Sequence, residues 1–223
     1  MNVFIFVRRY DEGMPKITSA DPDRAQSPAL GRRERAKADK RARILGAARE
    51  MLRENGFERM TVAQVADRAD VAVGTVFQYA ASKAELLMMV VADEYADTIP
   101  AVLHSRTGRQ APAARVRQLL EPLATRALQD PDTSAAIARE LLFGTEGPHR
   151  GEVIELVASL EREIAQTLHK DADAERAEAA ARLIVAGAIL ELNRTRTARA
   201  SRGTVERRLV ELVDLAIAGA TGG

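Results

Sequence analysis

Apolar residues recur at helical spacing along most of the 223-residue chain, and the first clear case lies between residues 44 and 52. One face of that segment is apolar and consists of Ile44, Leu45, Ala48, Met51 and Leu52. Asn55 and Gly56 follow, and glycine can take the left-handed conformation that ends many helices. The pattern therefore predicts a first helix that stops at residues 55–56.

Two short helices and one long helix are expected next. Thr61, with Gln64 three residues later, forms a capping box at the start of the segment TVAQVADRA and predicts the second helix. Residues 73–80 can form a third helix after a tight connection. Ser82 and Glu85 make another capping box, which predicts the start of the fourth.

Turn residues divide the rest of the chain into further helices. The expected helices cover residues 83–104, 113–129, 134–143, 152–169, 173–197 and 205–218. We expect Pro100 to kink the first of these and Pro122 to interrupt the second. Because Ala, Leu, Arg and Glu recur while aromatic residues make up only 4% of the chain, an all-α fold is predicted.

The third helix has an unusual outward face. A rotation of about 100° per residue turns Val76 and Ala80 inward. The outward face and its flanks then consist of Gly74, Thr75, Phe77, Gln78 and Tyr79. Such a face suits the DNA major groove, where Gln can pair with adenine and an aromatic ring can contact the thymine methyl group. The alternative is that Phe77 and Tyr79 are core residues of an ordinary helical bundle.

Charge is unevenly distributed between the two parts of the chain. Residues 1–83 hold 16 Lys and Arg against 11 Asp and Glu, whereas residues 84–223 hold 17 against 21. The positive excess is concentrated in RRERAKADKRAR, residues 32–43. A solvated helix start is one explanation of this run. Next to the third helix, however, it favours contacts of Arg41 and Arg43 with DNA phosphates.

The segment GFERMTVAQVADRADVAVGTVFQYAASKAELL, residues 56–87, resembles the DNA-binding region of the TetR family of transcriptional regulators. The resemblance rests on the Gly-Phe pair after the first helix, the GTVFQY run and the SKAELL run. It covers residues 37–90. It implies an all-α fold with an N-terminal three-helix helix-turn-helix domain and a C-terminal helical bundle for ligand binding and dimerisation.

The resemblance also implies roles for individual residues. Thr61 falls where the second helix meets phosphate, and Lys83 falls on the lysine that clamps the DNA backbone. The recognition helix would present Val73, Gly74, Thr75, Phe77, Gln78 and Tyr79. The chain departs from the family pattern at Ala72, Phe77 and Ala80, where Ser, Tyr and Phe are common.

These observations predict three parts of the chain. Residues 1–31 include a polar stretch with three prolines and are expected to be a disordered tail. Residues 32–82 would form the helix-turn-helix domain, and residues 83–223 would form the ligand-binding and dimerisation domain.

The last two helices carry broad apolar faces that a partner subunit could cover. The predicted dimer interface consists of Leu183, Gly187, Leu190, Leu209, Val213 and Ile217. An intramolecular helix hairpin is the alternative explanation. The candidate ligand-binding residues are Tyr95, Arg139, Glu140 and Phe143, in a pocket that would be mainly aliphatic. Tyr95, Arg139 and Glu140 could each equally be an ordinary surface or packing residue.

The sequence contains no recognisable catalytic constellation. The chain has no cysteine and three histidines, and Glu146 and His149 share the spacing of a di-iron ligand pair only across Gly147 and Pro148, which predict a loop. No phosphate-binding loop, dinucleotide fingerprint or nucleophile elbow occurs. We therefore expect no enzyme activity, no metal and no cofactor.

The apolar run at residues 183–190 is too short to cross a membrane, and the lack of cysteine suits a reducing compartment. We expect a cytoplasmic protein that does not insert into membranes.

Taken with the resemblance, these features predict a homodimeric repressor that binds a near-palindromic double-stranded DNA operator and is released by a small-molecule effector. A ligand-independent helix-turn-helix protein is the alternative, and a helical enzyme is a distant third.

Overall fold

The computed structural model describes residues 28–105, 110–198 and 201–222, and these residues form nine helices and no strand. By their contacts, the chain divides into Met1–Lys37 and Ala38–Gly223. Helix α1 begins at Pro28, so residues 28–31 of the expected disordered tail are helical, while residues 1–27 lie outside the described residues.

The part of the sequence that is predicted to bind DNA folds into the expected succession of helices. These are α1 (Pro28–Arg59), α2 (Val62–Arg68), α3 (Val73–Tyr79) and α4 (Lys83–His104). Gly56 interrupts α1 with a φ of 71°, where the sequence predicted the end of the helix. The capping box at α2 is complete, because the Gln64 N–H donates to Thr61 Oγ1 (3.2 Å) and the Thr61 N–H donates to Gln64 Oε1 (3.0 Å).

Only half of the second predicted capping box forms. The Glu85 N–H donates to Ser82 Oγ (3.0 Å), which caps α4. The Glu85 carboxylate does not turn back to the Ser82 backbone. It accepts hydrogen bonds from a later helix instead.

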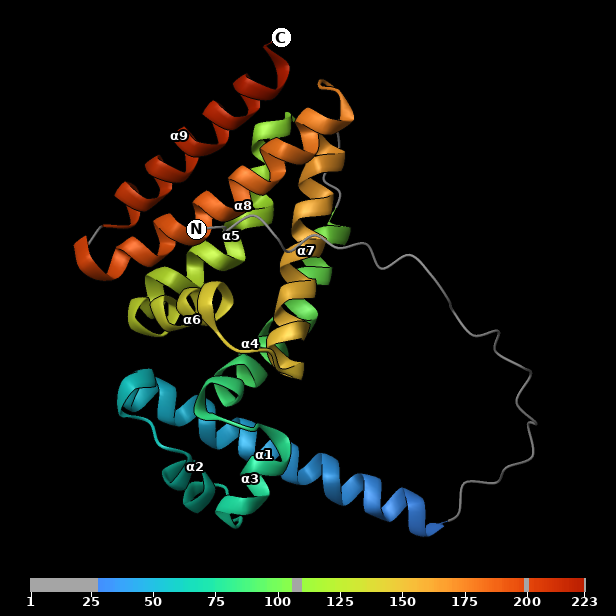
Figure 1. Cartoon of the computed structure of the whole chain (residues 1–223), viewed down its shortest axis with the longest axis vertical. Helices are drawn as coiled ribbons and strands as arrows, with labels where there is room; N and C mark the ends of the chain where they lie inside the picture. Colours follow the sequence, from blue (N-terminus) through green and yellow to red (C-terminus); the bar gives the residue numbers. More distant parts are fainter. Residues whose placement is uncertain (1–27, 106–109, 199–200, 223) are drawn as a thin grey trace. The chain divides into compact units, whose positions relative to one another are not determined.

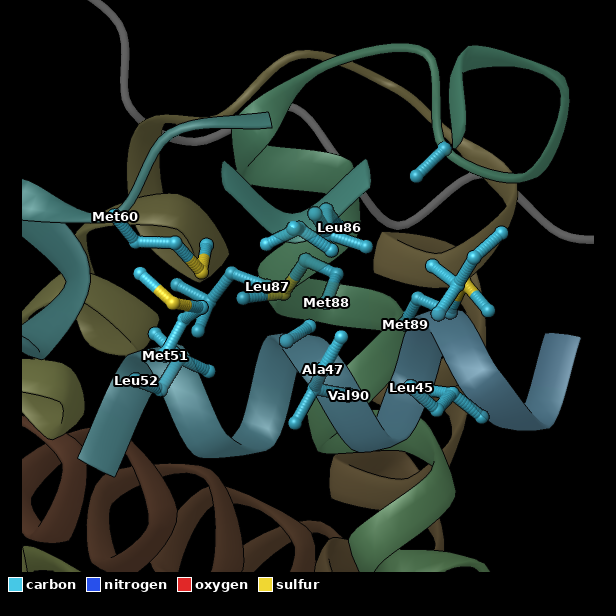
Figure 2. Packing of buried hydrophobic residues seen from close by; sticks show 14 of the residues in the cluster. Leu45, Ala47, Met51, Leu52, Met60, Leu86, Leu87, Met88, Met89 and Val90 are labelled. Atoms are coloured by element: carbon cyan, nitrogen blue, oxygen red, sulfur yellow. The ribbon is translucent and has the colours of Figure 1, made fainter. Parts of the chain in front are cut away.

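Apolar side chains of α1 and α4 form the first core. Figure 2 shows Leu45, Ala47, Met51 and Leu52 of α1 facing the run from Leu86 to Val90 of α4. Val65 and Ala66 of α2 and Val76 of α3 belong to the same buried cluster. Two residues from much later in the chain, Ala136 and Val153, complete it.

The C-terminal helices are α5 (Pro112–Gln129), α6 (Pro131–Phe143), α7 (Pro148–Leu168), α8 (Ala174–Ala198) and α9 (Arg202–Thr221). A proline stands in the first turn of α5, α6 and α7, where its missing N–H costs no helical hydrogen bond. For this reason α6 and α7 begin three and four residues earlier than the predicted 134 and 152. Both α4 and α5 continue through their internal prolines, Pro100 and Pro122.

A second apolar core joins α4, α5, α7, α8 and α9. Helices α8 and α9 pack side by side as an antiparallel pair, and α7 packs against both α4 and α8 (Figure 1). None of the helices in the described part of the chain is long and apolar enough to span a bilayer.

Candidate nucleic-acid interface and ligand cavity

A tight turn sets the position of α3 relative to α2. Asp70 has a positive φ of 52°, and the Val71 N–H donates to the Ala66 carbonyl (3.0 Å). Ala72 is the N-cap of α3 and supplies no side-chain hydrogen bond, unlike the Ser that is common there in the TetR pattern. The seven-residue helix is therefore held by the turn and by its buried Val76 rather than by a polar cap.

The outward face of α3 is arranged as the helical rotation predicts. Val76 and Ala80 are buried, whereas Gly74, Phe77 and Gln78 are exposed. Phe77 leaves 47% of its surface accessible, which rules out the alternative that it is a core residue. The remaining predicted contacts differ among themselves: Val73 is exposed, and Thr75 and Tyr79 are half-buried.

Thr61 and Lys83 flank this face, and both already have contacts within the chain. Thr61 is exposed and caps α2. Lys83 Nζ donates to the Glu58 carbonyl (3.0 Å) and lies 4.5 Å from the centre of the Phe57 ring. Lys83 therefore ties the start of α4 to the end of α1, and its contact with DNA stays a prediction.

The two basic residues predicted to contact phosphate have acidic partners. Arg41 pairs with Asp93 of α4 at 2.8 Å. Arg43 lies 3.5 Å from Asp39 and 3.6 Å from Asp70, and also donates to the Asp70 carbonyl (3.2 Å). The structure thus gives both arginines an internal role that the sequence analysis did not foresee.

Asp93 receives charged hydrogen bonds from Arg41 and Arg49. Partial burial of this carboxyl raises its pKa, but the hydrogen bonds and positive charges of the two arginines outweigh burial and hold the pKa below its ordinary value. Asp93 is consequently an anion at neutral pH and a fixed attachment point between α1 and α4.

A polar junction connects the start of α7 to the end of α3. The Glu85 carboxylate accepts the backbone N–H groups of His149 and Arg150, both at 3.2 Å. His149 Nε2 donates to the Tyr79 carbonyl at 2.9 Å. A side chain at Gly147 would meet Glu85 Oε1 at 2.1 Å, so only glycine fits there without a shift. The segment 146–149, predicted to be a loop, is helical from Pro148 onward.

An apolar cavity lies among α4, α5, α6, α7 and α8. It offers about 70 Å³ to the centre of a water-sized group, which is room for a few such groups and not for a long chain. Its walls are Val91, Tyr95, Ile99, Leu123, Arg126, Ala127, Ser134, Ile137, Ala138, Leu141, Val153, Leu156, Val157, Leu160 and Ile189. Of the four predicted ligand residues, Tyr95 is in this wall.

Three polar side chains interrupt the apolar wall of this cavity. Burial, with a smaller contribution from Glu94, raises the pKa of Tyr95 to about 12, although Arg126 opposes the shift. The phenol therefore stays neutral and can donate a hydrogen bond. Arg126 Nε and Ser134 Oγ are buried and have no hydrogen-bond partner among the described residues. A molecule bound here would find donors for one or two acceptor atoms.

The other three predicted ligand residues lie away from the cavity. Arg139 and Phe143 line a surface pocket beside Phe57, and Phe143 is 81% exposed. Arg139 pairs with Glu58 and Glu140 at 3.3 and 3.5 Å. Glu140 lines neither pocket, and the role of these three residues in ligand binding remains a prediction.

The predicted dimer-interface residues divide into two groups. Leu183 and Leu190 of α8 are exposed by 64% and 51%. Leu209 and Val213 of α9 are buried in the chain's own core, and Ile217 is partly buried against it. Gly187 lies against Leu212, because an added Cβ would meet both Leu212 methyl groups at 2.8 Å. The intramolecular hairpin therefore accounts for four of the six residues.

No group of three or more metal-ligating side chains occurs within the described ranges. His149, the one histidine joined to two elements of the DNA-binding part, is held by a carbonyl and by Glu152 (3.2 Å). Its side chain therefore links the start of α7 to the end of α3.

Comparison with known proteins identifies the family of this chain. Residues 44–89 match the family model described as bacterial regulatory proteins, tetR family. The HTH-type transcriptional repressor KstR of Rhodococcus jostii (strain RHA1) is 32% identical over 181 residues, which are 81% of this chain and 84% of that protein. The chain belongs to the TetR family of transcriptional regulators.

Solved TetR-family structures have the same fold. A TetR transcriptional regulator from Rhodococcus sp. RHA1 has a TM-score of 0.65 and 21% identity, over 81% of this chain and 97% of that chain. Thermus thermophilus FadR, a TetR-family repressor in complex with lauroyl-CoA, has a TM-score of 0.62 and 23% identity, over 80% and 94%. With its helix-turn-helix at α2–α3, the chain is a DNA-binding transcriptional repressor of the TetR family, as the resemblance implied.

Sequence reasoning missed several residues of this TetR-family chain that the fold brings together. Arg126 and Ser134 lie in the cavity wall, and Glu85 and His149 form the junction between α3 and α7. The capping-box spacing drew attention to Glu85, but it gave the wrong partner. Nothing in the sequence distinguishes Arg126 from the many other arginines of the chain.

Proposed function

We propose that this repressor binds its operator as a homodimer and is released by an apolar ligand that carries a hydrogen-bond acceptor, of the fatty acyl-CoA class. The observation that carries the proposal is the apolar cavity, in which the donors of Tyr95, Arg126 and Ser134 are the polar features. A thioester or carboxylate could accept from these donors while its aliphatic chain contacts the remaining wall. The lauroyl-CoA complex of Thermus thermophilus FadR supports this choice of ligand class.

The cavity must widen to receive such a ligand. A 12-carbon chain needs far more space than the cavity now provides, so its walls have to separate. Helix α4 contributes Val91, Tyr95 and Ile99 to the wall and also begins directly after the recognition helix. Separation of the wall would therefore shift the balance between a DNA-competent and a DNA-incompetent arrangement.

The ligand class is tested with lauroyl-CoA and with an operator obtained by in-vitro selection from random DNA. We expect calorimetry to detect lauroyl-CoA binding and saturating ligand to weaken operator affinity about 5- to 150-fold. Coenzyme A without the acyl chain should have no effect. The cavity-filling variant Val157→Phe should lose the lauroyl-CoA response but keep operator binding. If lauroyl-CoA does not bind, the proposed class is wrong.

The homodimer is proposed to form through the exposed leucines of α8 and α9. Leu183, Leu190 and Leu215 expose more than half of their surface, which favours burial against a second copy. We expect Leu183→Asp to sediment as a monomer and to lose operator binding. Leu142→Asp, which changes an exposed leucine of α6, should sediment as the wild type does. A Leu183→Asp protein that remains dimeric would exclude this interface.

A further inference from the structure

A chain of ion pairs runs from the cavity wall to helix α1. Arg126 of α5 pairs with Glu94 of α4, and Glu94 lies 3.9 Å from Arg49 of α1. Arg49 also pairs with Asp93, which pairs with Arg41 at 2.8 Å. All five side chains are only 20–39% exposed. Ion pairs at this degree of burial are less screened by solvent than pairs on an open surface.

Arg126 stands at the ligand end of this chain. It lines the apolar cavity, its Nε has no partner among the described residues, and Nη1 donates to Glu94. A guanidinium donates through five N–H groups in a fixed plane. An acceptor inside the cavity that takes Nε competes with Glu94 for the same cation, and drawing the planar guanidinium toward that acceptor weakens its contact with Glu94.

Loss of the Arg126–Glu94 ion pair alters the charge balance on α4. Asp93 and Glu94 are adjacent carboxylates, and three arginines neutralise them in the ligand-free state. When Arg126 turns away, Arg49 is the remaining cation near Glu94. Because Arg49 now pairs with Asp93, a stronger contact with Glu94 draws it away from Asp93 and changes how α1 is held on α4.

Helix α1 transmits this change toward DNA. Its apolar face packs in one core with α2 and α3, through Val65, Ala66 and Val76 (the α1–α4 part of this core is seen in Figure 2). A shift of α1 on α4 therefore moves the support of the recognition helix. In a dimer, this would alter the spacing of the two recognition helices.

We propose that Arg126 senses the acceptor group of the ligand. Glu94 and Arg49 then relay the withdrawal of Arg126 from Glu94 to α1. This inference rests on the proposed function, because it requires an acceptor-bearing ligand in the cavity. It adds the residue that detects the ligand and the route by which operator affinity falls. It also identifies Glu94, once it has lost Arg126 and has only Arg49 nearby, as the group that drives the change.

A ligand-free experiment tests the relay directly. Arg126→Gln leaves Glu94 without its α5 partner, so it should weaken operator affinity about 5- to 50-fold with no ligand present. Adding Glu94→Gln removes the unpaired carboxylate. The double variant should therefore regain operator affinity to within about 3-fold of wild type.

This rescue separates a relay from simple structural damage. If the ion pair only supports the fold, the double variant should bind no better than Arg126→Gln, and the inference would be overturned. Thermal melting and titration of the DNA-binding fraction show that each variant is folded. Glu54→Gln is the matched control, since Glu54 is a carboxylate of α1 that pairs with Arg68 at 2.7 Å outside the chain of ion pairs.

The ligand arm uses lauroyl-CoA with the full-length protein. Glu94→Gln should still bind lauroyl-CoA, but saturating ligand should change its operator affinity less than 2-fold, while Glu54→Gln keeps the wild-type response. A wild-type response in Glu94→Gln would refute the relay. If wild type does not bind lauroyl-CoA, the ligand class fails, and the ligand-free rescue still decides whether the relay exists.

Discussion

The basic face of α1 and the outward face of α3 were both predicted to contact DNA, yet they differ in what their side chains already do. Arg41 and Arg43 are engaged with carboxylates of the same chain. Helix α3, with the sequence VGTVFQY, has no charged residue and exposes Phe77 and Gln78. Arg41 and Arg43 therefore help to hold α1 in place, whereas the uncharged α3 presents the side chains suited to base edges.

The largest expected effect is at Phe77. Phe77→Glu would place a carboxylate beside DNA phosphates and bury it without a partner, so we expect about 100-fold weaker operator binding. Because Phe77 is half-exposed, the melting temperature should hardly change. Ile154→Glu on α7 makes a similar change elsewhere and should keep full affinity. Strong binding by Phe77→Glu would break the contrast between α1 and α3.

Alanine substitutions of Gln78 and Lys83 should affect operator binding in different ways. Gln78→Ala should cost about 1–3 kcal/mol on the preferred operator and relax preference at one base pair in each half-site. Lys83→Ala should weaken all sequences alike and also lower the melting temperature, since it loses the Glu58 carbonyl and the Phe57 ring. Affinities for operators with every base substitution in one half-site measure both. A change of base preference in Lys83→Ala alone would reverse the assignment.

Asp93 gives a prediction that depends on pH. Its folded-state pKa is lowered, so its contribution to stability is complete above the unfolded value of about 3.9 and is lost as pH falls through the folded value. Asp93→Asn should cost about 2 kcal/mol at pH 7, because two arginines lose a charged acceptor. In urea unfolding, the difference from wild type should shrink between about pH 5 and pH 2. A constant difference would mean that the carboxylate charge does not matter.

The smallest effect is expected from Arg41. If its role is the ion pair with Asp93, Arg41→Gln should lower stability by about 1 kcal/mol and leave the salt dependence of operator binding unchanged. If Arg41 contacts phosphate, as the sequence suggested, the log–log salt slope should fall by about 0.9. Binding titrations from 50 to 200 mM salt distinguish the two. The second result would remove the distinction between the two helices at this residue.

Local features of the fold could be predicted because they depend on neighbouring residues. The capping box at Thr61 and Gln64, the interruption at Gly56 and the rotation of α3 follow from spacing and backbone preference. The segment around Pro148 was predicted to be a loop, and the helix that begins at Pro131 was predicted to begin at residue 134. In both helices proline stands in the first turn, where it starts a helix.

The features that could not be predicted depend on contacts between distant residues. Arg126, Glu94 and Arg49 come from three helices, and only their packing shows that they are partners. Likewise, the spacing of Leu209 and Val213 fits a dimer interface and an internal core equally well. The described fold places both residues in the core. Amphipathic periodicity identifies a buried face but not what covers it.

The junction at Glu85 bears on how this protein could be recombined with its relatives. The core around α1–α3 includes Ala136 and Val153. At the start of α7, the His149 N–H donates to Glu85 and the His149 side chain donates to the Tyr79 carbonyl. A chimera that exchanged only residues 32–82 would keep the residues predicted to read DNA, but these would pack against residues of the other protein at positions 136 and 153. Successful exchanges should therefore carry Glu85 and residues 136 and 147–153 together with the helix-turn-helix, as one discontinuous cassette.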